Sequence, residues 1–490
     1  MFKKTIALLL AVLTLSSLVL MPSCKKDEGE EEGTTVTAAS TEEIDYLDTL
    51  DAPDFDEGEE FVIYQFGTAT IAAGQTFEKA VGEPICDSVY YRNQEIEARY
   101  GVKIVYQGAC YSNVSIVETT VDKITQQNLS QDDQIDLWEF SVVNAAALMY
   151  GGENFLPLNE MEYVNLDEPW WSSDANSHFE INGKIFTGTG DVSLSYYGMP
   201  FCLAINKRIA QEEGIDDRYG KSVYDLVRDG EWTYEKMLTM SANAANDKNG
   251  DQIMLPEDDV YGFQYDMGCG YAFLVSLGYG FSKVENGLPV VDMKNENITT
   301  AAEWIRDNLG ADSTHAIGGY TKDTEITQIF SSGRSLFGSA QISHIASKMR
   351  SYPFDFGIVP MPKADEEQER YYSYANIYYS AYMGVPSYTK NTEKVGFMLE
   401  VMAYKSYKSV RGEYIDECVV GRADSEEDAE MLRIVLDTVY YDLNLVMNFG
   451  KTRDYYLKYI HGEIPNYSST MGAVAINCGE EVQKYIDSFS

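Results

Sequence analysis

Basic residues are scarce in this sequence of 490 residues. It contains 37 lysines and arginines against 78 aspartates and glutamates, and its formal net charge at neutral pH is −41. A chain this acidic repels the phosphates of nucleic acids, so we expect neither DNA nor RNA as a partner. Acidity is more often a solubility feature than a binding site, and it therefore excludes more functions than it identifies.

Histidine and cysteine are also rare, and the short patterns of common enzymes are missing. The four histidines are scattered, no HExxH or GxSxG pattern occurs, and no two cysteines have the CxxC spacing of a zinc site. Gly220-Lys221-Ser222 resembles the end of a phosphate-binding loop but lacks the earlier glycine. We therefore expect a protein that is not an enzyme. An extracellular glycoside hydrolase is the alternative, because 78 acidic residues guarantee accidental carboxylate pairs.

The N-terminus carries a hydrophobic run that predicts export. Lys3 and Lys4 precede an apolar segment over residues 6–21, and Ser23 leads to Cys24. The segment is shorter than the ~20 residues of a membrane-spanning helix, and polar residues interrupt it, so we interpret it as a signal peptide. A cysteine after a small residue resembles the lipobox of bacterial lipoproteins, in which the signal is cut before the cysteine and the cysteine carries lipid. We expect a signal peptide over residues 1–23 and an extracytoplasmic protein anchored to the membrane by lipid on Cys24; secretion after a cut near Ser23 is the alternative.

Six cysteines remain after the one assigned to lipid. Six cysteines can pair in 15 ways, so the sequence does not determine their connectivity. Proximity in the sequence favours a bridge between Cys86 and Cys110, and buried free thiols are the alternative. The six are Cys86, Cys110, Cys202, Cys269, Cys418 and Cys478.

The chain after the signal divides into an acidic segment and a folded part. Residues 24–58 contain few large apolar side chains, so they predict a disordered tether. Short apolar runs predict strands over 61–66, 102–106 and 135–140. Helical patterning lies between and after these runs, over 87–100, from Ser112 to Ile124 and over 142–150. Strands that alternate with helices predict an α/β fold with a mainly parallel sheet.

The second half of the chain is mainly helical by its patterning. Extended runs are expected over 194–205, 356–359 and 380–385. The helices are expected over 206–214, 234–246, 299–308, 324–330 and 392–404.

Several separated segments together carry a family resemblance. They are residues 83–102, Met199-Pro-Phe-Cys-Leu-Ala-Ile-Asn-Lys207, Gly230-Glu-Trp-Thr-Tyr234, residues 247–263, Gly333-Arg-Ser-Leu-Phe-Gly338 and Gly357-Ile-Val-Pro-Met-Pro-Lys363. In their order over about residues 60–405 they resemble the extracellular solute-binding proteins of bacterial ABC importers, in the family 1 branch that mostly binds sugars. The resemblance implies a two-lobed, periplasmic-binding-protein-like α/β fold, with hinge-connected lobes and a ligand cleft between them.

The resemblance also implies lobe boundaries and a function. By analogy the N-terminal lobe comprises residues 59–203 plus 370–415 and the C-terminal lobe 204–365 plus 416–490, with crossings near Phe201 to Asn206 and Pro362 to Tyr374. The implied function is capture of a carbohydrate, expected to be an oligosaccharide, by closure of the lobes and its delivery to a membrane permease. A surface lipoprotein that binds glycans without transport is an alternative.

Ligand residues are expected where strands of an open parallel sheet end. Gly67 follows the first predicted strand and Glu139 lies near the end of the third. The segment 170–197 contributes aromatic and carboxylate side chains, which can contact the C–H faces and hydroxyls of a sugar. For each aromatic residue, packing in the core is the alternative, and Trp232 is assigned to the core. The ligand-binding candidates are Gly67, Glu139, Trp171, Asp191, Tyr197 and Tyr378.

An acidic loop over residues 247–258 has the spacing of a calcium site. Counted from the first aspartate, its oxygen-bearing groups fall at positions one, three, five, seven and twelve, close to the ligand spacing of an EF-hand. Gln252 replaces the usual glycine at position six, and position twelve is Asp instead of Glu. We expect a structural calcium ion and no other cofactor, with an acidic surface turn as the alternative. The candidate ligands are Asp247, Asn249, Asp251, the carbonyl of Ile253, and Asp258.

Overall fold

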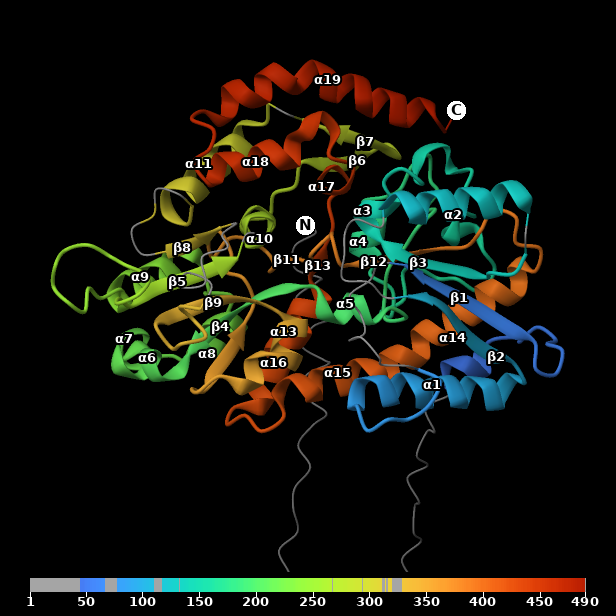
Figure 1. Ribbon diagram of the computed structural model, residues 1–490, viewed down its shortest axis with the longest axis horizontal. Coiled ribbons are helices and arrows are strands. Elements are labelled where there is room, and N and C mark those ends of the chain that lie inside the picture. Colours follow the sequence, from blue (N-terminus) through green and yellow to red (C-terminus); the bar gives the residue numbers. More distant parts are fainter. Residues whose placement is uncertain are drawn as a thin grey trace, which may run out of the picture. The chain divides into compact units, whose positions relative to one another are not determined.

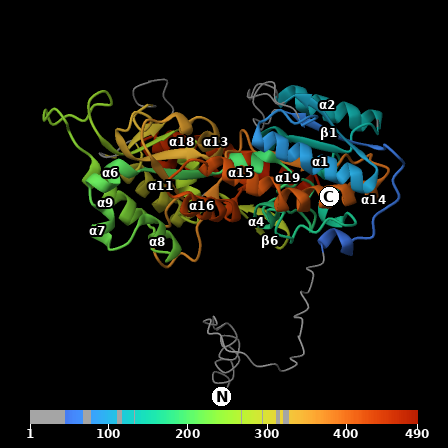
Figure 2. The same cartoon turned by 90° about the horizontal axis from the view of Figure 1, so that it is seen from below.

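The computed structural model describes residues 45–66, 77–109, 117–131, 133–266, 268–292, 294–310, 313, 316–319 and 328–489. Figures 1 and 2 show these elements in two views. The chain divides into two units, residues 1–49 and residues 50–490. The described part of the first unit contains a short 3-10 helix, η1 (Tyr46–Thr49). No helix among the described residues is long and apolar enough to span a membrane. The predictions on Cys24, Gly67 and Cys110 lie outside the described residues.

The first sheet of the larger unit has four strands in the order β12-β3-β1-β2. β1 pairs in parallel with β2 and β3, and β12 runs antiparallel to β3. In both views α2 lies on one side of β1, and α1 and α14 lie on the other (Figures 1 and 2). The predicted parallel arrangement therefore holds for β1, β2 and β3. The elements are β1 (Glu60–Phe66), β2 (Lys103–Ala109), β3 (Leu137–Ser141), β12 (Ala381–Gly384), α1 (Pro84–Tyr100), α2 (Val117–Ser130) and α14 (Thr392–Lys408).

The second sheet has five strands in the order β10-β4-β9-β5-β8. β5 is parallel to β8 and β9, whereas β4 is antiparallel to its two neighbours, β9 and β10. The strands are β4 (Phe201–Asn206), β5 (Tyr261–Asp266), β8 (Ala316–Gly319), β9 (Ser335–Gln341) and β10 (Phe356–Val359). The helices that precede, follow or contact these strands are α6 (Lys207–Glu212), α7 (Ile215–Tyr219), α8 (Val223–Arg228), α9 (Tyr234–Ala244), α10 (Cys269–Ser276), α13 (Ile342–Ser347) and α16 (Ser425–Asp437).

Two small sheets and further helices complete the larger unit. β11 (Ser373–Tyr374) pairs with β13 (Val439–Tyr440), and β6 (Ser282–Glu285) pairs with β7 (Leu288–Val291). The helices are α3 (Val142–Ala145), α4 (Ser173–Ser177), α5 (Leu194–Gly198), α11 (Glu296–Asn308), α15 (Val410–Val419), α17 (Leu443–Met447), α18 (Thr452–Ile460) and α19 (Tyr467–Asp487). The 3-10 helices are η3 (Tyr150–Gly152), η4 (Leu158–Glu160), η5 (Met349–Ser351) and η6 (Phe449–Lys451).

Local signals explain where several helices begin and end. α1 has proline at its first position and ends at Gly101, whose φ of 73° lies in the left-handed region that glycine tolerates. The side chain of Asn206 caps α6 by accepting from the N–H groups of Arg208 and Ile209, and Asn295 caps α11 in the same way. Side-chain caps of this kind are the start signals that the sequence pattern uses.

Two chain segments connect the two sheets and lie side by side. The Ser195 hydroxyl accepts from the N–H of Ala381 at 2.7 Å, and Ala381 pairs with the last residue of β3. Further along, Pro200 forms an antiparallel bridge with Ala375, next to the start of β4. Residues 193–200 and 375–381 are therefore two antiparallel crossing segments. They join the carboxyl edge of the first sheet to the second sheet.

The crossings lie elsewhere than the resemblance implied. Residues 201–206 form β4 inside the second sheet, so the predicted first crossing and the lobe boundary after residue 203 are displaced. Residues 194–198, expected to be extended, form the helix α5. An apolar run that is buried on all sides has the same pattern in a helix and in a strand, which explains the error. The other lobe boundaries stay a prediction.

Two further predictions need correction. The helix expected over 142–150 ends after α3 at Ala145, and a 3-10 turn follows with two glycines at positive φ. The predicted tether over 24–58 is too long, because its last part packs on the folded unit. The Tyr163 hydroxyl donates to the carbonyl of Asp51 at 2.6 Å, and the ring of Phe55 lies 6.0 Å from that of Phe397. An aromatic contact and a hydrogen bond therefore hold this part of the acidic segment against the folded unit.

Candidate functional site

The carboxyl edges of the two sheets face each other across the crossing segments. Residues 193–200 leave the first sheet where β3 ends and β12 begins, because Ser195 contacts Ala381 there. They enter the second sheet at Phe201, which pairs with Gln341, the last residue of β9. Ligands of open α/β sheets bind outside the carboxyl ends of the strands. The candidate site is therefore the region where these two edges meet, and side chains at both edges can contribute to it.

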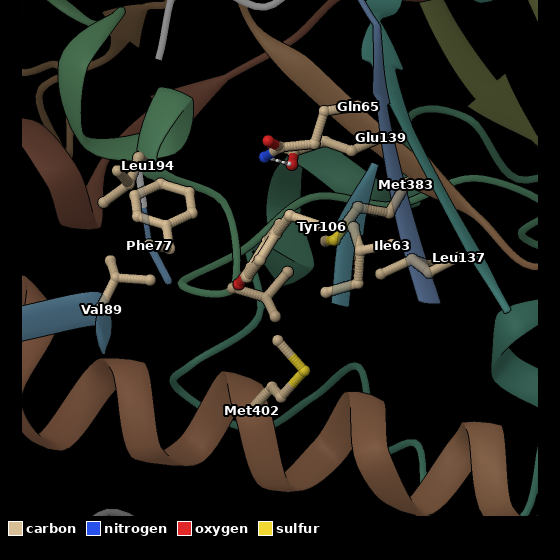
Figure 3. Close-up of a pocket in the computed structure, with 11 residues that line it drawn as sticks. Ile63, Gln65, Phe77, Val89, Tyr106, Leu137, Glu139, Leu194, Met383 and Met402 are labelled. Carbon is tan, nitrogen blue, oxygen red and sulfur yellow. Dashed lines mark hydrogen bonds between the residues drawn. The ribbon is translucent and has the colours of Figure 1, made fainter. Parts of the chain in front are cut away.

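A buried carboxylate network closes the edge of the first sheet. Glu139 of β3 is 5% exposed, and it accepts a hydrogen bond from Gln65 Nε2 of β1 at 2.7 Å (Figure 3). It also accepts a hydrogen bond from Ser193 Oγ at 2.5 Å. Burial raises the pKa of the Glu139 carboxyl, although both hydrogen bonds oppose the shift. The network connects two neighbouring strands to the first crossing segment, so it couples the sheet edge to the segment that leaves it.

The cavity beside this network is too small for a sugar. Its volume is about 10 Å³, which is room for about one water molecule. Figure 3 shows Met402 of α14 on its far side from Glu139 and the ring of Tyr106 between them. Glu139 therefore faces the interior of the lobe on this side. The lining residues are Ile63, Gln65, Phe77, Val89, Tyr106, Leu137, Glu139, Val192, Leu194, Met383 and Met402.

We call the part of the larger unit built on the first sheet the first lobe, and the part built on the second sheet the second lobe. The predicted tryptophan is held inside the first lobe. Trp171 is 4% exposed and donates its indole N–H to Glu400 Oε2 at 2.9 Å. Trp170 donates to the other oxygen of the same carboxylate, also at 2.9 Å. Glu400 lies on α14 and is fully buried. This arrangement fixes the Trp-Trp segment to the helix and leaves little of either ring to contact a ligand. Trp232 is fully buried, which confirms its assignment to the core.

Asp191 and Tyr197 lie at the base of the first crossing segment and are also buried. Asp191 is 1% exposed, and one of its oxygens lies 3.7 Å from Nη1 of Arg411, which also pairs with Asp437. Tyr197 donates its hydroxyl to the backbone carbonyl of Asp191 at 2.9 Å. Burial raises the pKa of the Asp191 carboxyl to about 7, although Arg411 opposes the shift. α15, which carries Arg411, packs against α1 and α14 of the first lobe and α13 and α16 of the second. This cluster therefore lies where both lobes meet.

Tyr378 is the predicted aromatic residue that keeps an exposed surface at the candidate site. It lies on the second crossing segment and is half-buried. The Arg453 guanidinium lies 5.3 Å from its ring centroid, and Asn376 Oδ1 accepts from its backbone N–H at 3.1 Å. A cation on one face polarises and orients the ring. Among the described ligand candidates, Tyr378 has the geometry that best suits contact with a ligand.

The sequence interpretation missed the edge of the second sheet. Asp266 ends β5, is half-buried, and accepts from the N–H of Cys269 at 3.2 Å, while its own N–H donates to Ser339 Oγ at 3.0 Å. Burial raises the pKa of its carboxyl. Gln341 ends β9 on the same edge. A polar residue that closes an apolar strand is the signal that identified Glu139, and Tyr-Gly-Phe-Gln-Tyr-Asp266 carries it as well. No comparable pattern in the sequence marks Arg453, whose guanidinium lies over the ring of Tyr378.

The predicted calcium loop is a tightly turned surface loop. The Asp247 carboxylate accepts from the N–H groups of Gly250 and Gln252 at 2.7 and 2.6 Å. Asn249 accepts from Asp251 N–H, and Asp251 accepts from Ile253 N–H. Gln252 has φ 67°, the left-handed conformation for which an EF-hand loop uses glycine at this position. The N–H of Asp258 donates to the carbonyl of Leu255. Among the residues that the structure describes, no three His, Cys, Asp or Glu side chains gather as a metal site, and calcium stays a prediction.

The described cysteines are buried free thiols. They are Cys86, Cys202, Cys269, Cys418 and Cys478. For these five cysteines the alternative of buried free thiols holds, and Cys86 forms no disulfide bridge. Burial raises the pKa of each thiol that shows a resolved shift, for example that of Cys478 to about 11, which keeps it protonated at neutral pH.

The fold and the facing edges define a class of protein: two-lobed α/β proteins that bind a ligand between their lobes. The chain matches bacterial extracellular solute-binding proteins over residues 93–403. This is more than half of its length, and the chain belongs to that family. Proteins of this family act outside the cytoplasm, and the match confirms the family resemblance seen in the sequence. A comparison with curated proteins finds no match.

Solved structures with the same fold include several that bind saccharides. The cyclic α-maltosyl-1,6-maltose binding protein of Arthrobacter globiformis is 13% identical, with 87% of this chain and 99% of that chain covered and a TM-score of 0.54. An extracellular solute-binding protein of Staphylococcus aureus in complex with maltose is 11% identical, with coverage of 88% and 99% and a TM-score of 0.54. The maltose-binding periplasmic protein MalE of Listeria monocytogenes, also with maltose, is 11% identical, with coverage of 87% and 99% and a TM-score of 0.54. These similarities establish the two-lobed fold.

Proposed function

We propose that this protein is the substrate-binding component of an ABC importer and that it captures a carbohydrate, an oligosaccharide in particular, between its two lobes. The observation that carries the proposal is the meeting of the two carboxyl edges across antiparallel crossing segments. Tyr378 lies on one crossing segment, and Asp266 ends β5 at the edge of the second sheet where the other crossing segment enters. An aromatic face together with a few polar groups is the chemistry that orients a sugar ring.

Two further facts favour a neutral sugar. The net charge of −41 disfavours an anionic ligand. Structural neighbours with the same fold are complexes with maltose or, in another case, with maltotetraose. Either carboxylate or amide groups can accept hydrogen bonds from sugar hydroxyls, so acidic edges do not oppose a neutral polyol.

Capture follows from hinge motion in this proposal. The two crossing segments and α15 connect the lobes, and changes of backbone angles in these connections rotate one lobe against the other. The ligand is bound without chemical change. The closed form of the protein then docks on a membrane permease and passes the ligand to it. A lipid on Cys24 holds the protein beside that permease, and residues 1–23 are removed as the signal peptide. Lipid attachment is supported by the lipobox-like sequence alone.

A ligand screen with product analysis tests the proposal. The mature protein is heated with maltose, maltotriose, maltotetraose, cellobiose, polyols and short peptides, each in excess, and the unfolding midpoint is recorded. A ligand at 100 times its dissociation constant stabilises the folded form by about 2.7 kcal/mol, which raises the midpoint measurably. We expect a saccharide to give this shift and to be recovered intact. Recovery of cleaved sugar would establish a hydrolase, and no shift with any saccharide would contradict carbohydrate capture.

A further inference from the structure

A second hollow lies on the second lobe, between α9 and α11. Its volume is about 530 Å³, within the range of small-molecule pockets. None of its lining residues belongs to the crossing segments 193–200 and 375–381 or ends a strand of the second sheet, so it is separate from the candidate site. We call it the α9–α11 hollow. It is lined by Glu235, Leu238, Thr239, Leu277, Tyr279, Asn297, Thr300, Ala301, Trp304 and Ala364.

The hollow combines an apolar floor with a polar rim. Its floor contains half-buried apolar side chains, including the rings of Trp304 and Tyr279. The rim consists of exposed polar side chains from both helices, namely Glu235, Thr239, Asn297 and Thr300. Hydroxyl, amide and carboxylate groups around an aromatic floor match the alternation of C–H faces and hydroxyls on a sugar ring.

The aromatic floor is fixed before any ligand arrives. The ring of Trp304 packs edge-to-face on Tyr234 at 5.4 Å, and the Tyr234 hydroxyl lies 2.7 Å from Ser276 Oγ in the core. A ring held by its neighbours loses little conformational entropy when a ligand binds, which favours affinity.

The charge of the lining selects among ligands. Among the described residues that line the hollow, Glu235 is the one carboxylate and none is a lysine, arginine or histidine. A phosphate, carboxylate or sulfate would meet a like charge and no cationic partner. A neutral polyhydroxylated ligand meets neither obstacle.

We infer that the α9–α11 hollow is a second carbohydrate site, which binds one or two sugar units outside the cleft between the lobes. The choice of ligand class rests on the proposed function, whereas the location rests on the hollow itself. A second site on an anchored binding protein would hold carbohydrate near the cell surface and so raise the local ligand concentration around the cleft.

Tryptophan fluorescence tests this inference, because one indole reports on the hollow. Of the five tryptophans, four are 5% exposed or less, and Trp304 is half-buried. Acrylamide quenching therefore reports mainly on Trp304. The mature protein is titrated with maltose, maltotetraose and cellobiose. We expect a saturable loss of quenching with at least one of them, together with a stoichiometry of two saccharides per chain by calorimetry.

Two variants on α11 make the test specific. Thr300→Arg places a long side chain in the hollow, and Glu303→Arg adds the same side chain at an exposed position of the helix outside the lining. We expect the first variant to lose the Trp304 response and one saccharide per chain, and the second to behave as wild type. Tyr378→Ala separates this site from the cleft, because it should keep the Trp304 response while the cleft loses affinity.

The outcomes distinguish the inference from the proposed function. If a saccharide binds with a stoichiometry of one and Trp304 stays equally open to quenching, the inference is wrong and the proposed function stands. If the Trp304 response survives Thr300→Arg, the response arises elsewhere and the inference is wrong. If Trp304 responds in wild type and in Tyr378→Ala but no second saccharide binds, the hollow binds sugar and capture in the cleft fails. No Trp304 response to any saccharide of the panel overturns the inference.

Discussion

The buried carboxylate of Glu400 allows the sharpest prediction about stability. Its two oxygens accept hydrogen bonds from the indole N–H groups of Trp170 and Trp171, each at 2.9 Å. The oxygen that bonds to Trp171 also accepts from the backbone N–H of Asn165 at 3.3 Å. The substitution Glu400→Gln keeps the size of the side chain but replaces one accepting oxygen by an NH2 group, which only donates. One indole N–H of the pair then faces another donor inside the lobe.

The expected cost follows from these contacts. A hydrogen bond contributes about 0.5–1.5 kcal/mol, and a buried donor left without an acceptor costs about 1–3 kcal/mol. Because the amide keeps one oxygen that still accepts, the two effects overlap rather than add in full. We therefore expect Glu400→Gln to lower the free energy of unfolding by about 2–4 kcal/mol.

Urea unfolding at neutral pH measures the change. The control is Glu393→Gln, which makes the same substitution at an exposed position on the same helix and should stay within about 0.5 kcal/mol of wild type. A loss of less than about 1 kcal/mol in Glu400→Gln would refute the assignment of this carboxylate as the support of the Trp-Trp segment.

Four further predictions concern the site, the crossing, the loop and the anchor. Tyr378→Ala should weaken saccharide binding at least about tenfold, or 1.4 kcal/mol, with little change in the unfolding midpoint, because the ring is half-buried; calorimetry decides, and an affinity within twofold of wild type would contradict it. The raised pKa of Asp191, about 7 against 3.8 for the unperturbed group, means that the folded state holds its proton more tightly than the unfolded state does. Its contribution to stability is thus fully present below about pH 4 and is lost as the pH rises through 7. Asp191→Asn should therefore gain stability relative to wild type between pH 5 and pH 8. The same difference in the free energy of unfolding between variant and wild type at both pH values, measured with urea, would argue against this. Calcium should raise the midpoint of wild type and of the control Asp54→Asn but not of Asp247→Asn, and equal midpoints with calcium and with chelator in wild type would leave the loop an ordinary acidic turn. Cys24→Ser should release the protein from the membrane fraction, whereas unchanged fractionation would refute lipid anchoring there.

The first half of the fold could be predicted because its strands are short apolar runs separated by amphipathic helices. β1, β2 and β3 were expected within two or three residues of their observed bounds, and the polar residue near the end of β3 marked Glu139 at the sheet edge. The parallel sheet then followed from chain order alone. The family resemblance added the second lobe, whose mixed sheet has no simple alternation of strand and helix.

The crossing segments and the exposure of side chains could not be predicted in the same way. Residues 194–205 are apolar throughout, and apolarity does not separate the helix α5 from the strand β4 when both are buried. The sequence alone does not favour either Trp171 or Tyr378 as a sugar-binding aromatic residue. Their difference depends on Glu400 and Arg453, which lie more than 70 residues away in the chain. Partners at that distance become visible only in the folded chain.

Hydrogen–deuterium exchange of the mature protein, with and without the saccharide that stabilises it most, tests the central claim most directly. The account predicts that the ligand slows exchange on both sides of the cleft at once: around residues 139–142 and 376–380 at the first sheet and crossing, and around residues 266–271 and 339–342 at the edge of the second sheet. Protection limited to one of the two edges, or absent from both, would contradict capture of the ligand between the lobes.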